Sequence, residues 1–361
     1  MVKILSRLPP KYLIRFKCVS KRWHALIGNP DFLSKNLLNH SIIAQNPNED
    51  DPLRLILFFA QDSDTGNLIN SFRYYDSLHC ASQIPLNLPS AAPHYYITAS
   101  CNGLLCLWDD TVRSDVYLWN LATSSELKAL PAASSHRHTG LRVFPGQVGF
   151  GFDSGSNDFK VVRLFQVVEE DGTEWAEAQI YSLRCGSWRQ LDLCVPNYVN
   201  SRTAALDGMF LWYAGDKLEK HVPDVDDEII VAFDFTDEEF RTMMFPDARF
   251  FSDYGEYTRT VTELNEYVAM MVFPLDERKK NMHLDIWVMI EFGVRESWTR
   301  LLSIQLPLHL ERPLRFWKNR GLFMENSEGQ LVLYDLFAQT ETNLHFEGFG
   351  GTLKVVDYTL G

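Results

Sequence analysis

The sequence has no hydrophobic run long enough to cross a membrane. A helix that spans a bilayer needs roughly 20 apolar residues, whereas the longest apolar runs, Leu55 to Ala60 and Tyr267 to Phe273, have the length of single strands. Lys3 and Arg7 lie in a helical pattern with no apolar segment or cleavage site behind them, so no secretory signal is predicted. We therefore expect no membrane partner, and a location in the cytoplasm, the nucleus or both.

Paired cysteines and catalytic signatures are also missing. No Cys-x-x-Cys pair is followed by a second one, which argues against a zinc site and predicts reduced, mostly buried thiols. The sequence contains neither a Gly-x-Ser-x-Gly elbow nor a Walker phosphate loop. We therefore predict no catalytic residue, no cofactor and no metal ion, and a protein that is not an enzyme. The six cysteines are Cys18, Cys80, Cys101, Cys106, Cys185 and Cys194.

Three segments imitate functional motifs but have simpler interpretations. Gly149-Phe150-Gly151 with Gly155 has the wrong spacing for a dinucleotide-binding loop and predicts turns at strand edges. His136-Arg137-His138 is expected to be a solvated loop, because two serines precede it. Asp224 to Glu228 lacks the glycine and the distant acid of a calcium loop. None of the three predicts a cofactor or metal site.

Charge divides the chain into two parts. Residues 1–40 hold eight basic side chains and one acidic one, a net charge of +7, so with a total of -13 the rest of the chain carries -20. Opposite charges predict two different partners. A basic segment can bind nucleic acid, but here the basic residues are mixed with an apolar pattern, and the acidic remainder repels phosphates. The sequence therefore favours an acidic protein partner for residues 1–40, and no nucleic acid.

The first 40 residues, called the head below, predict three or four short helices. The pair Pro9-Pro10 ends the first helix, because proline disfavours helical geometry in the residue before it. From Lys11 to Ile27 apolar residues recur every three or four positions, with Ser20 suited to cap a break and Gly28 to end the run. So short a segment cannot bury a stable core alone. The head must pack on the rest of the chain or on a partner.

The order of residues in the head is more specific than its periodicity. The distinctive stretches are Ile4 to Pro9, Leu13 to Trp23, Leu26-Ile27 and Pro30 to Phe32. Together they resemble the F-box of the large land-plant F-box families. The resemblance implies binding to the Skp-family adaptor of a Skp, cullin and F-box ubiquitin ligase, and through the adaptor to cullin; the alternative for each apolar residue is that it packs only the core of the head. The resemblance assigns Leu8, Pro9, Leu13, Phe16, Val19, Lys21 and Trp23 to the adaptor contact.

This resemblance departs from the family pattern at the amino terminus. The family's F-box usually begins several residues earlier, with a leucine-proline-acid segment, whereas this sequence begins inside the first helix. The missing turn would bury apolar area against the adaptor, at about 25 cal/mol per Å². We therefore expect weaker adaptor binding, or a start codon assigned too late.

The remainder of the chain predicts a mostly β body. Residues 41–53 are polar, acidic and proline-bearing, as expected of a linker, and residues 54–361 contain short strand-like runs separated by turn residues. Five of these runs place an aromatic two residues before an apolar residue, at a period near 50 residues with about four strands per unit. This pattern predicts a kelch-like β-propeller of six or seven blades, with a pair of β-sandwiches as the alternative. The five aromatics are Trp119, Tyr181, Phe233, Trp287 and Tyr334, and Phe72 to Leu78 is a weaker sixth unit.

The body also carries stretches with a family likeness. They are Ser100 to Cys106, Gly149 to Asp153 with Asn157 to Val162, Asp285 to Met289 with Glu296 to Thr299, and Phe316 to Asn319. These stretches resemble the F-box-associated domain, and the last two are similar to the subgroup that includes the S-locus F-box proteins. The resemblance spans nearly the whole chain, but it does not identify a target.

The sequence predicts a substrate receptor of a ubiquitin ligase, in which the head holds the adaptor and the propeller recruits a target protein for ubiquitination. An adaptor-independent scaffold protein with a degenerate F-box and, less favoured, a propeller hydrolase are the alternatives. Acidic segments, interpreted as loops between blades, favour a basic target, although they also serve solubility. The candidate target-binding residues in them are Glu169, Glu170, Asp171, Asp224, Asp226 and Asp227.

Overall fold

The computed structural model describes most of the body and a small part of the head. Among the described residues, no helix is long and apolar enough to span a bilayer. The predicted first helix, the segment 33–38 and the linker 41–53 lie outside the described residues. The described residues are 19–27, 32, 54–61, 68–74, 77–82, 95–109, 115–120, 127–132, 141–169, 171–192, 199–206, 208–214, 228–254, 257–264, 267–274, 282–318 and 321–359.

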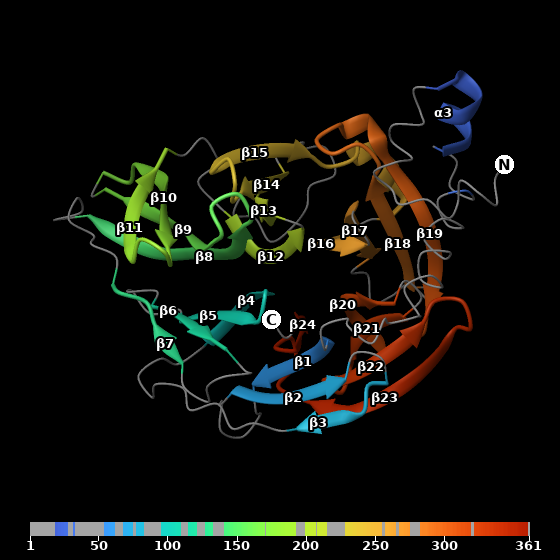
Figure 1. Cartoon of the computed structure of the whole chain (residues 1–361). Coiled ribbons are helices and arrows are strands. Elements are labelled where there is room, and N and C mark those ends of the chain that lie inside the picture. Colours follow the sequence, from blue (N-terminus) through green and yellow to red (C-terminus); the bar gives the residue numbers. More distant parts are fainter. Residues whose placement is uncertain are drawn as a thin grey trace.

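The body is built from six antiparallel sheets of four strands each, arranged as blades around a central axis (Figure 1). In the first three blades the strands, from the axis outward, follow the order of the chain, except that the last strand of the chain supplies the innermost strand of blade 1. Blade 1 holds β24 (Lys354–Thr359), β1 (Arg54–Gln61), β2 (Leu68–Tyr74) and β3 (Cys80–Ser82). Blade 2 holds β4 (Tyr95–Cys101), β5 (Leu104–Asp109), β6 (Val116–Trp119) and β7 (Lys128–Ala129). Blade 3 holds β8 (Arg142–Asp153), β9 (Asp158–Val168), β10 (Glu174–Ser182) and β11 (Ser187–Leu191).

The other three blades repeat this plan without exchange of strands. Two short 3-10 helices, η1 (Ala248–Tyr254) and η2 (Arg295–Ser297), lie between strands. Blade 4 holds β12 (Val199–Leu206), β13 (Met209–Ala214), β14 (Ile229–Asp234) and β15 (Glu239–Met244). Blade 5 holds β16 (Tyr257–Leu264), β17 (Tyr267–Pro274), β18 (Met282–Met289) and β19 (Trp298–Leu306). Blade 6 holds β20 (Leu310–Trp317), β21 (Gly321–Asn326), β22 (Gln330–Asp335) and β23 (Thr340–Glu347).

The ring is closed by the two ends of the body. The carboxy-terminal strand β24 pairs with β1, placing Tyr358 opposite Leu55. The innermost strands contact one another in sequence around the axis, from β4 through β8, β12, β16 and β20 to β24 and back to β4. Closure places the inner edges of the six sheets around the axis, where the neighbouring blades shield them from pairing with another chain. No strand before Arg54 takes part in the described sheets.

The five repeated aromatics of the sequence lie at corresponding positions in five blades. All five aromatics are buried, and each lies on the third strand of its blade: β6, β10, β14, β18 and β22. The weaker sixth unit overlaps β2, which is the third strand of blade 1. The predicted kelch-like propeller is therefore confirmed, with six blades, and the β-sandwich alternative is wrong.

Tryptophans on outermost strands connect neighbouring blades. Trp188 of β11 donates its indole N–H to the backbone oxygen of Pro131 in blade 2, at 2.7 Å. Trp298 of β19 donates in the same way to Met244 of blade 4, at 3.0 Å. Both tryptophans lie at the start of the fourth strand of their blade. Each indole thus satisfies a polar group at an interblade seam that its ring also helps to cover.

Two glycines predicted to form turns instead lie inside a strand. Gly149 and Gly151 belong to β8, the inner strand of blade 3. A Cβ at Gly149 would lie 2.6 Å from the ring of Trp212, and one at Gly151 would lie 2.3 Å from the ring of Phe235. Both rings come from blade 4. The interpretation as strand-edge turns is wrong for these two residues, because aromatic packing between blades, and not chain reversal, excludes a side chain here.

Chain direction gives the propeller two distinct ends. We call the end where the innermost strands begin the entry end, and the end where they finish the exit end. Because the strands of a blade are antiparallel, connections from a second to a third strand, and from one blade to the next, lie at the entry end. Turns from a first to a second strand, and from a third to a fourth, lie at the exit end.

Candidate functional site

In the described part of the head, one helix begins at exposed residues. Helix α3 (Lys21–Ile27) starts after Ser20, whose Oγ accepts a hydrogen bond from the backbone N–H of Trp23 at 3.2 Å. This is the N-cap predicted for Ser20. Figure 1 shows α3 outside the ring of blades. Leu8, Pro9, Leu13 and Phe16 of the predicted adaptor contact lie outside the described residues.

Three predicted adaptor residues can be located. Val19 is 60% exposed, Lys21 is exposed and Trp23 is half-buried. An exposed valine beside a cationic side chain and a partly covered indole is a surface that another chain can cover, since apolar area removed from water stabilises a complex. The position of these three residues is compatible with an adaptor contact, which stays a prediction.

The predicted acidic target site belongs to two neighbouring blades. Glu169 and Asp171 are exposed and follow β9, in the connection to β10. The backbone N–H of Thr173 donates to Asp171 Oδ1 at 2.8 Å, and this hydrogen bond lowers the pKa of the Asp171 carboxyl, which is therefore ionised at neutral pH. Glu170 lies outside the described residues, as do Asp224, Asp226 and Asp227 between β13 and β14.

These segments lie within blades, contrary to the prediction of loops between blades. Both connect a second strand to a third, in blade 3 and in blade 4, so the strands that flank them reach the same entry end. A third acidic segment, Asp237 to Glu239, joins β14 to β15 and lies at the exit end. The sequence did not show this, because a period near 50 residues gives the number of blades. It does not show which connections lie within a blade and which join one blade to the next.

One acid of the predicted target segment has a structural role. Glu228, the last residue of the segment Asp224 to Glu228, forms an ion pair with the buried Arg259 through its Oε2 atom at 2.9 Å. The Arg259 guanidinium also lies against the rings of Phe245, Phe251 and Tyr257, at 5.0 to 5.1 Å from each centroid. A charge desolvated in this way needs its carboxylate. Glu228 therefore stabilises the seam between blades 4 and 5 and is not available to a target.

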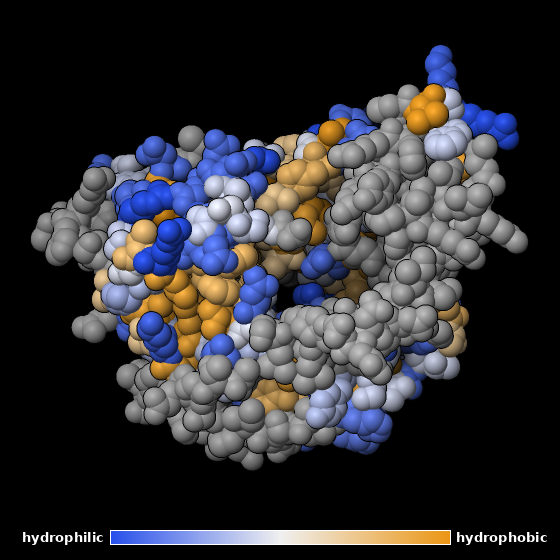
Figure 2. Space-filling model, in the orientation of Figure 1, coloured by the Kyte–Doolittle hydropathy of each residue, from blue (hydrophilic) through white to orange (hydrophobic). Residues whose placement is uncertain are grey.

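A channel of about 1250 Å³ runs along the propeller axis between the innermost strands. Figure 2 shows a central hollow with hydrophilic residues beside it. Hydroxyl groups line much of the wall, from Thr98 and Ser100 of β4 and from Thr258, Thr260 and Thr262 of β16. Charged residues of β20 and β24 also line the channel, including Arg312, Arg315, Lys354 and Asp357, and apolar residues such as Phe150 line much of the remainder.

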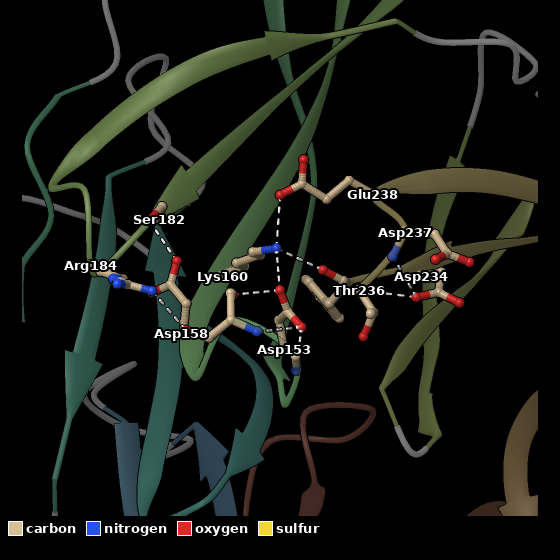
Figure 3. Close-up of polar contacts among 12 residues, drawn as sticks. Asp153, Asp158, Lys160, Ser182, Arg184, Asp234, Thr236, Asp237 and Glu238 are labelled. Carbon is tan, nitrogen blue, oxygen red and sulfur yellow. Dashed lines mark hydrogen bonds and ion pairs between the residues drawn. The ribbon is translucent and has the colours of Figure 1, made fainter.

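A buried ionic cluster joins blades 3 and 4 at the exit end (Figure 3). Lys160 of β9 contacts Asp153 Oδ2 at 2.7 Å and Glu238 Oε1 at 2.8 Å, and it donates to the backbone oxygen of Phe235 at 2.9 Å. Ser156 donates its hydroxyl to Asp153 Oδ2 at 2.5 Å. The Lys160 ammonium and the Ser156 hydroxyl hold the pKa of the Asp153 carboxyl well below its usual range. In the sequence, the segment that holds Asp153 and Lys160 stood out only through its resemblance to the F-box-associated domain.

The described residues provide no metal centre. No three His, Cys, Asp or Glu side chains within them gather closely enough to hold an ion. His136-Arg137-His138 lies outside the described residues. Cys101, Cys106 and Cys185 are free thiols. Cys106 is buried, Cys101 is half-buried, and Cys185 is exposed in the turn between β10 and β11, an exception to the prediction of mostly buried thiols. Burial raises the pKa of the Cys106 thiol, which keeps it protonated.

A closed β-propeller preceded in the chain by a separate helix, α3, defines a class of two-part proteins. Two family models match the chain: the F-box domain over residues 1–35 and the F-box associated beta propeller domain over residues 67–359. The chain belongs to the family of F-box proteins with an F-box-associated β-propeller. The family is generally a non-catalytic substrate receptor, and its F-box implies binding to a Skp-type adaptor and, through it, to cullin.

Relatives from Arabidopsis thaliana resemble both parts of the chain. An F-box protein is 28% identical over 344 residues, covering 88% of this chain and 75% of the relative. An F-box/kelch-repeat protein is 28% identical over 345 residues, covering 93% and 86%. The F-box protein CPR1 is 27% identical over 397 residues, covering 99% and 87%. These similarities support a general role in substrate recognition.

Proposed function

We propose that this protein is the substrate-recognition subunit of an SCF-type ubiquitin ligase, which recruits a target through the propeller for ubiquitination and degradation. The observation that carries the proposal is the closure of the ring between β1 and β24, because the described sheets complete the propeller without a strand from the head. The head can then hold a second partner. A location in the cytoplasm, the nucleus or both is part of this proposal.

Such a receptor acts by bringing its target close to the conjugating enzyme. Holding the target on the same assembly as the conjugating enzyme raises the effective concentration of an acceptor lysine, without any catalytic group in the receptor. The opposite charges of the two parts, +7 for residues 1–40 and -20 for the rest, suit two partners of different chemistry.

Replacing Leu13 and Phe16 together by aspartate is expected to abolish capture of a purified Skp-family adaptor by the full-length protein. Two charges on the apolar face would lose buried apolar area and leave carboxylates desolvated at the contact. Pull-down with equal amounts of each variant measures this. A matched control places aspartate at Phe292 and Phe337, two exposed residues of exit-end turns. Capture by the Leu13 and Phe16 variant equal to that by the control would refute the adaptor contact.

The acidic entry-end segments are proposed to bind a basic surface of the target. Once affinity capture with ligase activity blocked has identified a target, Glu169→Lys with Asp171→Lys is expected to weaken its binding about tenfold at low salt and less at high salt. The control, Glu239→Lys with Glu296→Lys, reverses two exposed acids at the exit end. Equal loss in both variants would show that net charge matters and not this site.

A further inference from the structure

Two strongly exposed apolar side chains flank blade 6 at the entry end. Leu308, in the connection from β19 to β20, is 61% exposed, and Phe349, in the connection from β23 to β24, is 60% exposed. By comparison, Phe337 and Phe292, in exit-end turns, are 49% and 39% exposed. Apolar area that a partner removes from water stabilises the complex. The entry end of blade 6 therefore has more to gain from a partner than the exit end.

Backbone hydrogen bonds join three connections at this end into one surface. The N–H of Ser327, in the turn from β21 to β22, donates to the backbone oxygen of His309 at 2.8 Å. On the other side of the same turn, the N–H of Gly348 donates to the backbone oxygen of Gly329 at 3.2 Å. The turn thus lies between the two connections that carry the exposed apolar side chains. We call the three connections together the blade 6 surface: residues 307–311, 326–330 and 347–352.

The exposed phenylalanine of this surface has a fixed backbone. The N–H of Phe349 donates to the backbone oxygen of Gln61 at 2.7 Å, and the backbone oxygen of Phe349 accepts from the N–H of Thr352 at 3.1 Å. The Thr352 hydroxyl donates to the same oxygen at 2.5 Å and accepts from the N–H of Gln61 at 3.1 Å. A side chain on a fixed backbone loses less conformational freedom when a partner binds it. Phe349 is therefore preorganised for contact with a partner.

Acidic side chains accompany the two apolar ones. Glu311 on β20, Glu328 in the turn from β21 to β22, and Glu347 at the end of β23 are all exposed. None of the three forms an ion pair with another residue in the described part of the chain. The blade 6 surface contains no lysine and no arginine. Because complementary charges speed association and select the partner, this surface suits a positively charged one.

The charge of the surface argues against two other occupants. A second copy of this chain that used the same surface would place the same carboxylates against one another, and the phosphates of a nucleic acid would be repelled in the same way. Basic groups nearby do not cancel this charge, since Arg312 is paired with the buried Glu325 and Lys354 is half-buried in the channel wall. The favoured occupant is a positively charged segment of another protein.

We propose that the blade 6 surface binds a segment of the target protein in which a lysine or arginine lies between two apolar side chains. The apolar side chains cover Leu308 and Phe349, and the cation pairs with Glu328 in the turn between them. The inference rests on the proposed receptor function and names the chemistry of its target. It adds an apolar contact to the acidic segment of Glu169 and Asp171, which lies at the same end of the propeller.

Selection of random twelve-residue peptides displayed on phage, with the full-length protein as bait, tests the surface. The selected peptides are expected to share a lysine or arginine between apolar residues. Synthetic copies of these peptides are expected to bind Leu308→Ser with Phe349→Ser about tenfold more weakly than wild type in fluorescence anisotropy, because the apolar contact is lost. The control, Phe292→Ser with Phe337→Ser, removes two apolar side chains of exit-end turns and is expected to bind as wild type does.

Two further readouts use the same peptides. Glu311→Gln, Glu328→Gln and Glu347→Gln together are expected to weaken binding about fivefold at low salt and less at high salt. Hydrogen exchange of the unmodified protein needs no variant, and so it does not depend on how a variant folds. The bound peptide is expected to slow exchange in residues 326–330 and 347–352 but not in the exit-end turns.

Three results would overturn the proposal: selection of no peptide with the stated pattern, equal binding by wild type and the serine pair, or exchange that slows only outside the blade 6 surface. Self-association that the serine pair abolishes, measured by sedimentation velocity, would also overturn it, because the occupant would then be a second copy. Adaptor capture is a separate readout, which the serine pair is expected to leave unchanged. A protein that captures the adaptor but binds no such peptide would contradict this surface and leave the receptor function standing.

Discussion

Replacing Asp153 by asparagine is expected to lower the free energy of unfolding by about 3 kcal/mol at neutral pH, because it leaves the buried Lys160 ammonium short of one carboxylate. Lys160 and Asp153 are both buried, with Nζ and Oδ2 2.7 Å apart. Glu238 and the oxygen of Phe235 still contact the ammonium, which keeps the loss at the lower end of the range for a broken buried pair. Urea unfolding measures the effect.

The same pair predicts a dependence on pH. The pKa of Asp153 is lowered in the folded protein, so its contribution to stability is fully present above the usual aspartate pKa of about 4 and is lost as pH falls toward the lowered value. The difference between wild type and Asp153→Asn should therefore shrink below pH 4. The control is Asp192→Asn, at an exposed aspartate. An equal effect of the two substitutions, or a difference that does not change with pH, would contradict the role of the cluster.

Replacing Gly151 by alanine is expected to destabilise the protein by about 2 kcal/mol, although the same change at an unconstrained site stabilises slightly. The new Cβ would lie 2.3 Å from ring carbons of Phe235, which is fully buried and cannot move without displacing blade 4 from blade 3. Phe235→Leu removes the ring, so in the double variant the added cost of alanine should largely disappear. Urea unfolding of the two single variants and the double variant gives this coupling.

The matched control for this substitution is Gly350→Ala. No atom lies within 4 Å of the position of its Cβ, and Gly350 is exposed between β23 and β24. This change should leave the free energy of unfolding within about 0.5 kcal/mol of wild type. A Gly151 variant as stable as the Gly350 variant would show that the seam between blades 3 and 4 can open without loss.

The fold was predictable because each blade repeats its own local signals. An aromatic two residues before an apolar residue recurs on the third strand of each blade from Trp119 to Tyr334. Such signals depend only on neighbours in the sequence. The identity of the closing strand was not predictable in this way, since the pairing of β24 with β1 joins Tyr358 to Leu55 across the whole body.

The sites were less predictable because their partners are far apart in the sequence. The Trp212 ring of the next blade excludes a side chain at position 149, which explains the glycine there. Whether Glu228 can bind a target depends on its ion pair with Arg259, a residue of another blade. Charge and periodicity indicated which segments are acidic, but only the strand order shows which end of the propeller each one reaches.

The most direct test of the receptor interpretation is hydrogen–deuterium exchange of the full-length protein with and without a purified Skp-family adaptor. The exposed Val19 and the position of α3 outside the ring predict that the adaptor slows exchange within residues 1–35 and leaves β1 to β24 unchanged. Exchange in residues 1–35 that is already slow in the free protein and does not respond to the adaptor would contradict this interpretation, because the head would then be covered by its own chain.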